Sequence, residues 1–231
     1  MFKYLKLLYH SFYRTKIFFP KKNYSLLGED KFIEKYFRNK AKGFYIDVGC
    51  YHPLVGNNTQ LLYRKGWSGI NLDINYYSIK IFNFLRKRDI NIHLGISNKK
   101  DRLTMYYRKE INMLNTLDEK IAKIYFKNGY KKKDIQVNTL DYCIHKNFKK
   151  LNKIDFINID VEGLELNVLK SLNFTIYKPQ LVCVEIHNYK KLKSNSVYNF
   201  LVKKGYQVVW KNKYSFIFEK KNCFYNYSRI E

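Results

Sequence analysis

Acidic and small residues stand at the ends of several short apolar runs in this sequence. The run FYIDVG at 44–49 carries Asp47 and ends in Gly49, and the run GINLD at 69–73 ends in Asp73. A strand-end glycine lets the backbone approach a ligand, and an acid about twenty residues further on can hydrogen-bond ribose hydroxyls. The pair predicts nucleotide binding, although a tight turn at Gly49 and a helix N-cap at Asp73 would explain each residue alone.

A second group of chemically useful side chains follows two later apolar runs. The run at 154–159 leads into Asp160 and Glu162, and the run at 181–186 supplies Glu185, with His187 just after it. If these runs are adjacent strands, Asp160 and Glu185 could bind a Mg²⁺-like ion. Alternatively, His187 could act as a general base beside an acceptor hydroxyl. Helix capping by the acids and a structural histidine are the simpler explanations.

The segments around these residues alternate apolar runs with helical patterns, which predicts parallel strands joined by crossover helices. We expect strands at 44–49, 69–73, 91–96, 154–159 and 181–186. The expected helices cover 57–65, 76–88, 163–171 and 195–204, and the last two strands, 206–211 and 214–219, form a hairpin. The predicted fold class is α/β, a Rossmann-like, doubly wound and mostly parallel sheet with a C-terminal antiparallel hairpin.

The middle of the chain has a weaker pattern. Residues 101–107 alternate like a strand, 108–133 are polar and lysine-rich with no element predicted, and a short strand and helix run from 135 to 148. The cysteines show no CxxC pair and no zinc-ligand spacing, so we expect buried free thiols in a reducing cytosol. They are Cys50, Cys143, Cys183 and Cys223.

The first residues form a basic amphipathic arm. Lys3, Lys6 and Arg14 recur at helical spacing among leucines and phenylalanines. Packing on the rest of the chain is the favoured role, and contact with an anionic membrane surface is the alternative. We therefore divide the chain into an arm at 1–23, a domain at 24–220 and a tail at 221–231. No signal peptide or membrane span is expected, which predicts a cytoplasmic protein, peripheral at the inner membrane face if the arm binds lipid.

The formal net charge is +25, from 44 Lys and Arg against 19 Asp and Glu among 231 residues. Such a charge attracts nucleic acid, anionic lipid or acidic glycans. The lysines are spread along the whole chain, which favours solvated faces over a nucleic-acid patch.

Taken in order, these motifs resemble the FkbM methyltransferases, over about residues 24 to 186. The stretch GFYIDVGCYHPLVGNNTQLLYRKGWSGINLD at 43–73 carries the most specific likeness. Further matches are YSLLGEDKFI at 24–33, GIS at 95–97, MLNTL at 113–117, VNTLD at 137–141 and IDFINIDVEGLELNVLKSLNF from 154.

The resemblance implies a class I methyltransferase that uses S-adenosylmethionine. It places Asp47 and Gly49 beside the methionine portion of the cofactor, Asp73 on the ribose, and Asp160 and Glu162 at the catalytic face. The other candidate cofactor-binding residues in the matching motifs are Cys50, His52, Asn58, Thr59 and Ser97. The sequence departs from the commoner pattern at 50–53, where CYHP replaces Ala-Asn and a glycine.

The family is associated with O-methylation of sugars and natural products, so the expected partner is a sugar or glycan acceptor. RNA methylation is the alternative that the charge favours, but the aromatic motif of amino-methylating enzymes and a lysine tetrad for ribose methylation are absent. A scaffold that binds cofactor without catalysis is a third alternative, against which the acids at 47, 73, 160 and 162 argue. The oligomeric state is not indicated.

Overall fold

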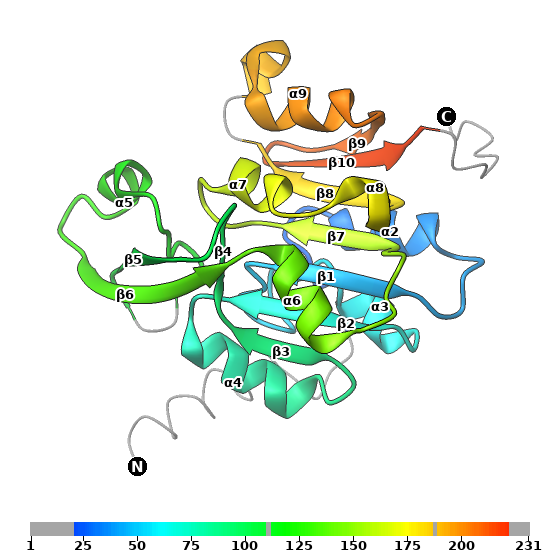
Figure 1. Ribbon diagram of the computed structural model, residues 1–231, viewed down its shortest axis with the longest axis horizontal. Coiled ribbons are helices and arrows are strands. Elements are labelled where there is room, and N and C mark those ends of the chain that lie inside the picture. The colour runs from blue at the N-terminus through cyan, green and yellow to red at the C-terminus, as the bar shows by residue number, and fades with distance from the viewer. Residues whose placement is uncertain (1–20, 110–111, 187–188, 222–231) are drawn as a thin grey trace.

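A seven-stranded sheet in the order β3-β2-β1-β7-β8-β10-β9 forms the centre of the protein (Figure 1). The structure is a computed structural model, and it describes residues 21–109, 112–186 and 189–221. The strands from β3 to β8 are parallel, whereas β10 is antiparallel to both β8 and β9. Their bounds are Phe44–Val48 (β1), Ser68–Asp73 (β2), Ile90–His93 (β3), Phe156–Ile159 (β7), Leu181–Glu185 (β8), Tyr206–Lys211 (β9) and Ser215–Lys220 (β10). The predicted fold class is therefore confirmed.

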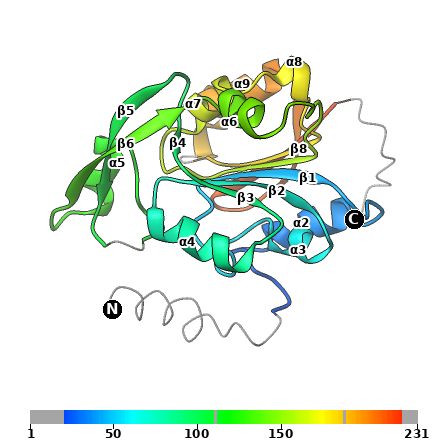
Figure 2. The same cartoon turned by 60° about the horizontal axis from the view of Figure 1, so that its bottom comes forward.

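Helices cover both faces of this sheet (Figure 2). One face carries Glu29–Tyr36 (α2), Gln60–Arg64 (α3) and Tyr76–Leu85 (α4). The other carries Leu140–Asn147 (α6), Glu165–Lys170 (α7), Phe174–Tyr177 (α8) and Ser196–Lys203 (α9), and a 3₁₀ turn covers Tyr189–Ser194 (η2). Successive residues of β1 point to opposite faces, so Tyr45 packs with Ile33 and Trp67 of one core, and Ile46 joins the other.

A second, three-stranded sheet in the order β4-β6-β5 lies beside the main one. Its strands are Gly95–Ile96 (β4), Asp101–Tyr107 (β5) and Lys131–Asn138 (β6), and Glu119–Tyr125 forms the helix α5. The strand predicted at 91–96 is thus wrong as one element, because the chain leaves the main sheet after β3 and pairs β4 with β6. Gly95 permits this change, since a Cβ there would collide with Val137.

Three short helices, α2, α5 and α8, were not predicted. Two of them begin at capping side chains, because Asp118 accepts from the backbone N–H groups of Lys120 and Ile121, and Asn173 accepts from those of Thr175 and Ile176. The strand expected from 135 begins at Lys131. Its first residues are exposed lysines, which have no apolar alternation to reveal them.

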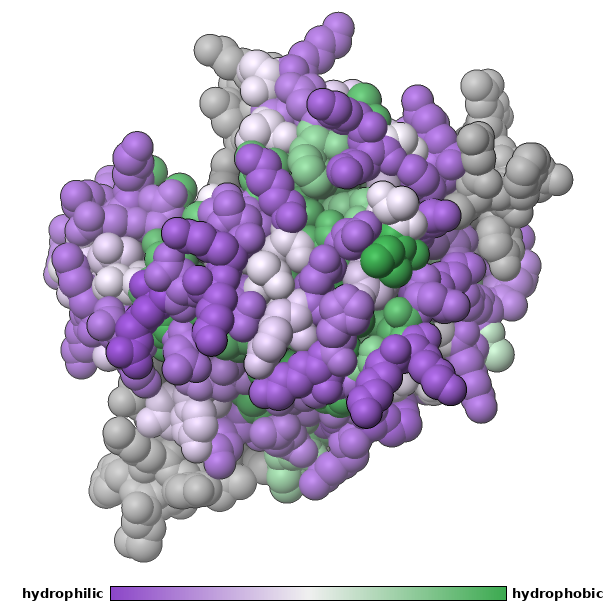
Figure 3. All heavy atoms as spheres, viewed as in Figure 1, coloured by the Kyte–Doolittle hydropathy of each residue, from purple (hydrophilic) through white to green (hydrophobic). Residues whose placement is uncertain are grey.

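The expected free thiols are confirmed for Cys50, Cys143 and Cys183, which are buried and unbridged. Cys223, the basic stripe of the arm at 1–19 and the tail from 222 lie outside the described residues. Within the described part of the chain, no helix is both long and apolar enough to cross a membrane. The face seen in Figure 3 is mostly hydrophilic, with scattered apolar side chains.

A buried cation lies between the sheet and α3. Arg86, directly after α4, is 1% exposed. Its guanidinium donates to Asp89 Oδ2 at 2.9 Å, to Thr59 Oγ1 at 2.7 Å and to Tyr45 Oη at 2.9 Å, and also to the side chain of Gln60. A buried charge is tolerated only when it is paired and hydrogen-bonded, so these contacts hold α3, α4 and β1 together.

We expect Arg86→Met to lower the free energy of unfolding by about 3–5 kcal/mol, because Asp89 would stay buried without its ion pair. Urea unfolding measures the change. Arg88→Met is the matched control, since Arg88 is exposed and stacks on Tyr63 at the surface, and it should cost less than about 1 kcal/mol. Equal effects of the two substitutions would contradict the role given to Arg86.

Gly49 lies where β1 passes closest to the end of β7. Its φ is +80°, and a Cβ at this position would overlap the backbone oxygen of Asp160. We expect Gly49→Ala to lower the free energy of unfolding by more than about 4 kcal/mol. Gly66 has a φ of +99° with open space around it, so Gly66→Ala should show only the conformational cost of about 1–2 kcal/mol. Thermal unfolding of both variants tests whether the overlap dominates.

Candidate active site

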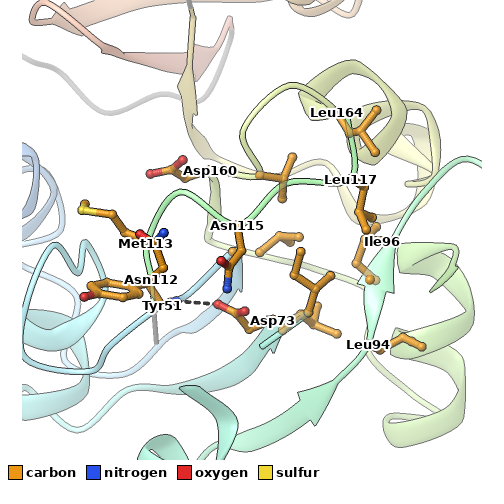
Figure 4. A pocket seen from close by; sticks show the side chains of 16 residues that line it. Tyr51, Asp73, Leu94, Ile96, Asn112, Met113, Asn115, Leu117, Asp160 and Leu164 are labelled. Atoms are coloured by element: carbon orange, nitrogen blue, oxygen red, sulfur yellow. Dashed lines mark hydrogen bonds between the residues drawn. The ribbon is translucent and has the colours of Figure 1, made fainter. Parts of the chain in front are cut away.

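A pocket opens at the carboxyl ends of β1, β2 and β7, where the strand order reverses (Figure 4). Open α/β sheets bind their ligands at this switch point. The pocket is partly enclosed by side chains and partly open to solvent. Its lining combines polar groups with an apolar wall and consists of Val48, Gly49, Tyr51, Leu72, Asp73, Ile74, Leu94, Gly95, Ile96, Asn112, Met113, Asn115, Leu117, Asp160, Val161 and Leu164.

Asp73 is a buried carboxylate in this pocket. Oδ2 accepts from the backbone N–H of Tyr51 at 2.8 Å, and Oδ1 accepts from that of Asn75 at 2.6 Å. Asn75, rather than Asp73, caps α4 through its own side chain. Burial raises the pKa of Asp73 to about 6. Each carboxylate oxygen keeps a further lone pair, so Asp73 can still accept hydrogen bonds from a ligand.

Asp47 lies beneath the pocket and is absent from its lining. Its carboxylate accepts from the side chains of Asn57, Thr59 and Asn158, at 3.2, 3.1 and 2.8 Å. Burial raises its pKa. Asn58 joins the same layer by donating to Asn158 Oδ1 at 2.8 Å. The structure thus brings Asp47, Asn58 and Thr59 together as support for the strand ends.

Three other predicted cofactor-binding residues also lie away from the pocket lining. Cys50 packs with Ile79 and Phe82, and burial raises the pKa of its thiol well above the usual value. His52 is buried, and its Nδ1 accepts from the backbone N–H of Leu54 at 3.1 Å. Ser97 donates its backbone N–H to Asn138 at 3.0 Å.

Three carboxylates meet at the ends of β7 and β8. One oxygen each from Asp160, Glu162 and Glu185 lies within 4.8 Å of the others. The strands are parallel neighbours, as the sequence predicted. His187, the fourth candidate, lies outside the described residues. Oxygen ligands in this number suit a hard divalent cation.

The carboxylates of this cluster affect one another. Partial removal of the Asp160 carboxylate from water, together with the like charges of Glu185 and Glu162, raises the pKa of Asp160 well above its usual range. The residue as a whole is exposed, so the like charges are the stronger of these reasons. A cation or a donor hydroxyl in the cluster would relieve this repulsion.

The segment after β5 supplies groups that sequence reasoning missed. The hydroxyl of Tyr125 donates to Glu162 Oε2 at 2.7 Å, and the hydroxyl of Thr116 donates to the backbone oxygen of Glu162 at 2.7 Å. Asn112, Met113 and Asn115 line the pocket itself. The motif MLNTL at 113–117 was the one signal for this segment, and it carried no assigned role.

Comparison with known proteins adds to this geometry. Residues 47–208 match the Methyltransferase FkbM domain. A predicted O-methyltransferase from Klebsiella pneumoniae superimposes with a TM-score of 0.47 at 9% identity, covering 92% of this chain and 86% of that one. No curated protein matches the sequence.

Two further solved structures show similar levels of likeness. The O-methyltransferase from Bacillus cereus in complex with S-adenosylhomocysteine superimposes with a TM-score of 0.42 at 12% identity, covering 92% of this chain and 89% of that one. A predicted RNA methyltransferase from Pyrococcus horikoshii superimposes with a TM-score of 0.44 at 10% identity, covering 87% of this chain and 91% of that one. The domain match spans most of the sequence, and the chain therefore belongs to the FkbM methyltransferase family, as its motifs predicted.

Proposed function

We propose that this methyltransferase transfers the methyl group of S-adenosylmethionine to a hydroxyl of a sugar, in the synthesis of a glycan. One observation carries the proposal: Asp160 belongs both to the pocket and to the carboxylate cluster. A cofactor in the pocket and an acceptor at the cluster would then meet at Asp160.

The pocket supports binding of a nucleoside. Asp73 offers two acceptor oxygens for ribose hydroxyls, and the apolar wall around Ile96 and Leu117 suits a base. Gly49 leaves the backbone open for the methionine portion. In this proposal Asp47, Asn58 and Thr59 act by positioning the end of β1, through the layer of hydrogen bonds beneath it.

The transfer is an in-line displacement in which the acceptor oxygen bonds the methyl carbon while the carbon–sulfur bond breaks. The enzyme must align the two groups and take the proton of the acceptor hydroxyl. Asp160, Glu162 and Glu185 would hold Mg²⁺, which lowers the pKa of a bound hydroxyl. His187 would instead accept the proton directly, and the two routes differ in their response to a chelator.

The acceptor is inferred from the charge around the site. Three carboxylates beside the pocket repel a phosphate backbone, whereas they accept hydrogen bonds from sugar hydroxyls. The protein as a whole is positively charged, which favours nucleic acid, but the proposed reaction site carries three acidic side chains. A sugar acceptor agrees with the family association, and contact of residues 1–19 with an anionic membrane remains a prediction.

The first prediction concerns the ribose ligand. S-Adenosylhomocysteine should bind, and its affinity should fall about tenfold from pH 7.5 to pH 5, because Asp73 has a pKa of about 6 and accepts hydrogen bonds best when ionised. Asp73→Asn should weaken binding about tenfold at pH 7.5 and remove this pH dependence. Calorimetry measures these affinities, with Asp134→Asn as an exposed control. A wild-type affinity that does not change with pH would contradict the role given to Asp73.

The second prediction concerns the carboxylate cluster. If it holds a cation, Mn²⁺ used as a paramagnetic probe should bind the wild type, and Asp160→Asn and Glu185→Gln should each weaken it about tenfold or more. Glu165→Gln is the matched control, because Glu165 lies nearby but accepts from the backbone N–H of Gly163 outside the cluster. Electron paramagnetic resonance measures free Mn²⁺.

Methyl transfer from labelled S-adenosylmethionine to a panel of free and nucleotide-linked sugars completes this test. A chelator abolishes transfer on the metal route, whereas on the histidine route His187→Ala loses transfer and the chelator has little effect. Label appearing in RNA instead of sugars would overturn the proposed acceptor. Full transfer by folded Asp160→Asn, Glu185→Gln and His187→Ala variants would overturn the site.

A further inference from the structure

Asn115 has a side chain that the fold alone does not explain. The residue is 8% exposed and lines the pocket, yet neither its Nδ2 nor its Oδ1 has a hydrogen-bond partner among the described residues. Buried amides in folded proteins are nearly always paired. A buried amide in a pocket whose nitrogen and oxygen both lack a partner suits a ligand group with both donor and acceptor character.

The backbone holds Asn115 in place. Its neighbour Thr116 pairs with Tyr106 through N–H···O contacts of 3.2 and 2.8 Å. The Thr116 hydroxyl donates to the backbone oxygen of Glu162 and accepts from the N–H of Asp118 at 2.9 Å. Rigid placement of this kind lowers the entropic cost of binding a ligand.

The amide lies opposite Asp73. In Figure 4 its nitrogen points toward the Asp73 carboxylate. A carboxylate oxygen only accepts and an amide nitrogen only donates, and these two groups are not hydrogen-bonded to each other. A hydroxyl between them would donate to Asp73 and accept from Asn115. A second, adjacent hydroxyl carries one proton, which it would donate either to the other Asp73 oxygen or to Asn115 Oδ1.

We propose that Asn115 is a second ribose-binding residue, which holds the vicinal hydroxyls of the cofactor together with Asp73. This inference rests on the proposed use of S-adenosylmethionine. It adds a ribose-binding residue from the segment between β5 and β6 to Asp73 at the end of β2. The cofactor would thus be enclosed by the segment that also contacts Glu162.

Calorimetry with S-adenosylhomocysteine and its 2′-deoxy and 3′-deoxy analogues tests the proposal. Removing at least one of the two hydroxyls should weaken binding to the wild type about tenfold. Asn115→Leu should bind S-adenosylhomocysteine about tenfold more weakly than the wild type does. Removing the same hydroxyl from the ligand should then lower the affinity of this variant by less than about a further threefold, because the partner of that hydroxyl is already absent. Asp134→Asn, the exposed control outside the pocket lining, should bind all three ligands as the wild type does.

The outcomes separate this inference from the cofactor proposal. If the wild type binds S-adenosylhomocysteine and Asn115→Leu binds it equally well, the amide is satisfied by water and the inference fails alone. If the wild type does not bind it, the cofactor proposal fails and this inference fails with it. Should Asn115→Leu not fold, Asn115→Asp keeps the shape and removes the donor, and unchanged binding by that variant would overturn the proposal.

Discussion

Hydrogen bonds link the buried guanidinium of Arg86 to β1 and β7, two of the strands whose ends form the pocket. The guanidinium donates to Thr59, Thr59 donates to Asp47, and Asp47 accepts from Asn158 on β7. Because an unpaired charge in such a place is very costly, the chain folds so that these partners surround it. The network therefore runs from the end of α4 across β1 to β7, and it fixes the edge that a ligand meets. The pocket inherits its rigidity from this layer.

Two kinds of carboxylate follow from this arrangement. Asp47 accepts hydrogen bonds from Asn57 and Thr59, just before α3, and from Asn158 on β7, and it does not line the pocket. Asp73 is the last residue of β2, Asp160 directly follows β7, and both line the pocket. Residue type alone does not separate these roles. Direction along the pleat and distance from the strand end decide whether an acid supports the site or faces its ligand.

The parallel strands β1, β2, β7 and β8 were predictable because each is a largely buried run, and the placement of their acids at one edge of the sheet was predictable because parallel strands end there. In the second sheet, the strand expected at 101–107 matches β5, whereas the start of β6 was not predictable, because its first four residues are exposed and carry no apolar period. Asn115 and Tyr125 lie between these two strands, in a stretch to which the sequence pattern assigned no role. Cys50, His52 and Ser97 were predicted from their place in the motifs, but they are buried and do not line the pocket. Position in a motif does not show which way a side chain points.

The backbone of Glu162 links the segment between β5 and β6 to the carboxylate cluster. Its φ is +55°, a left-handed conformation that is strained for a residue with a side chain. Such strain persists only where surrounding contacts impose it. Here Thr116 holds the backbone oxygen and Tyr125 holds the carboxylate, and both come from the segment between β5 and β6. The orientation of one cluster carboxylate is therefore set by the same segment that presents Asn115 to the pocket, so the pocket and the carboxylate cluster share one structural support.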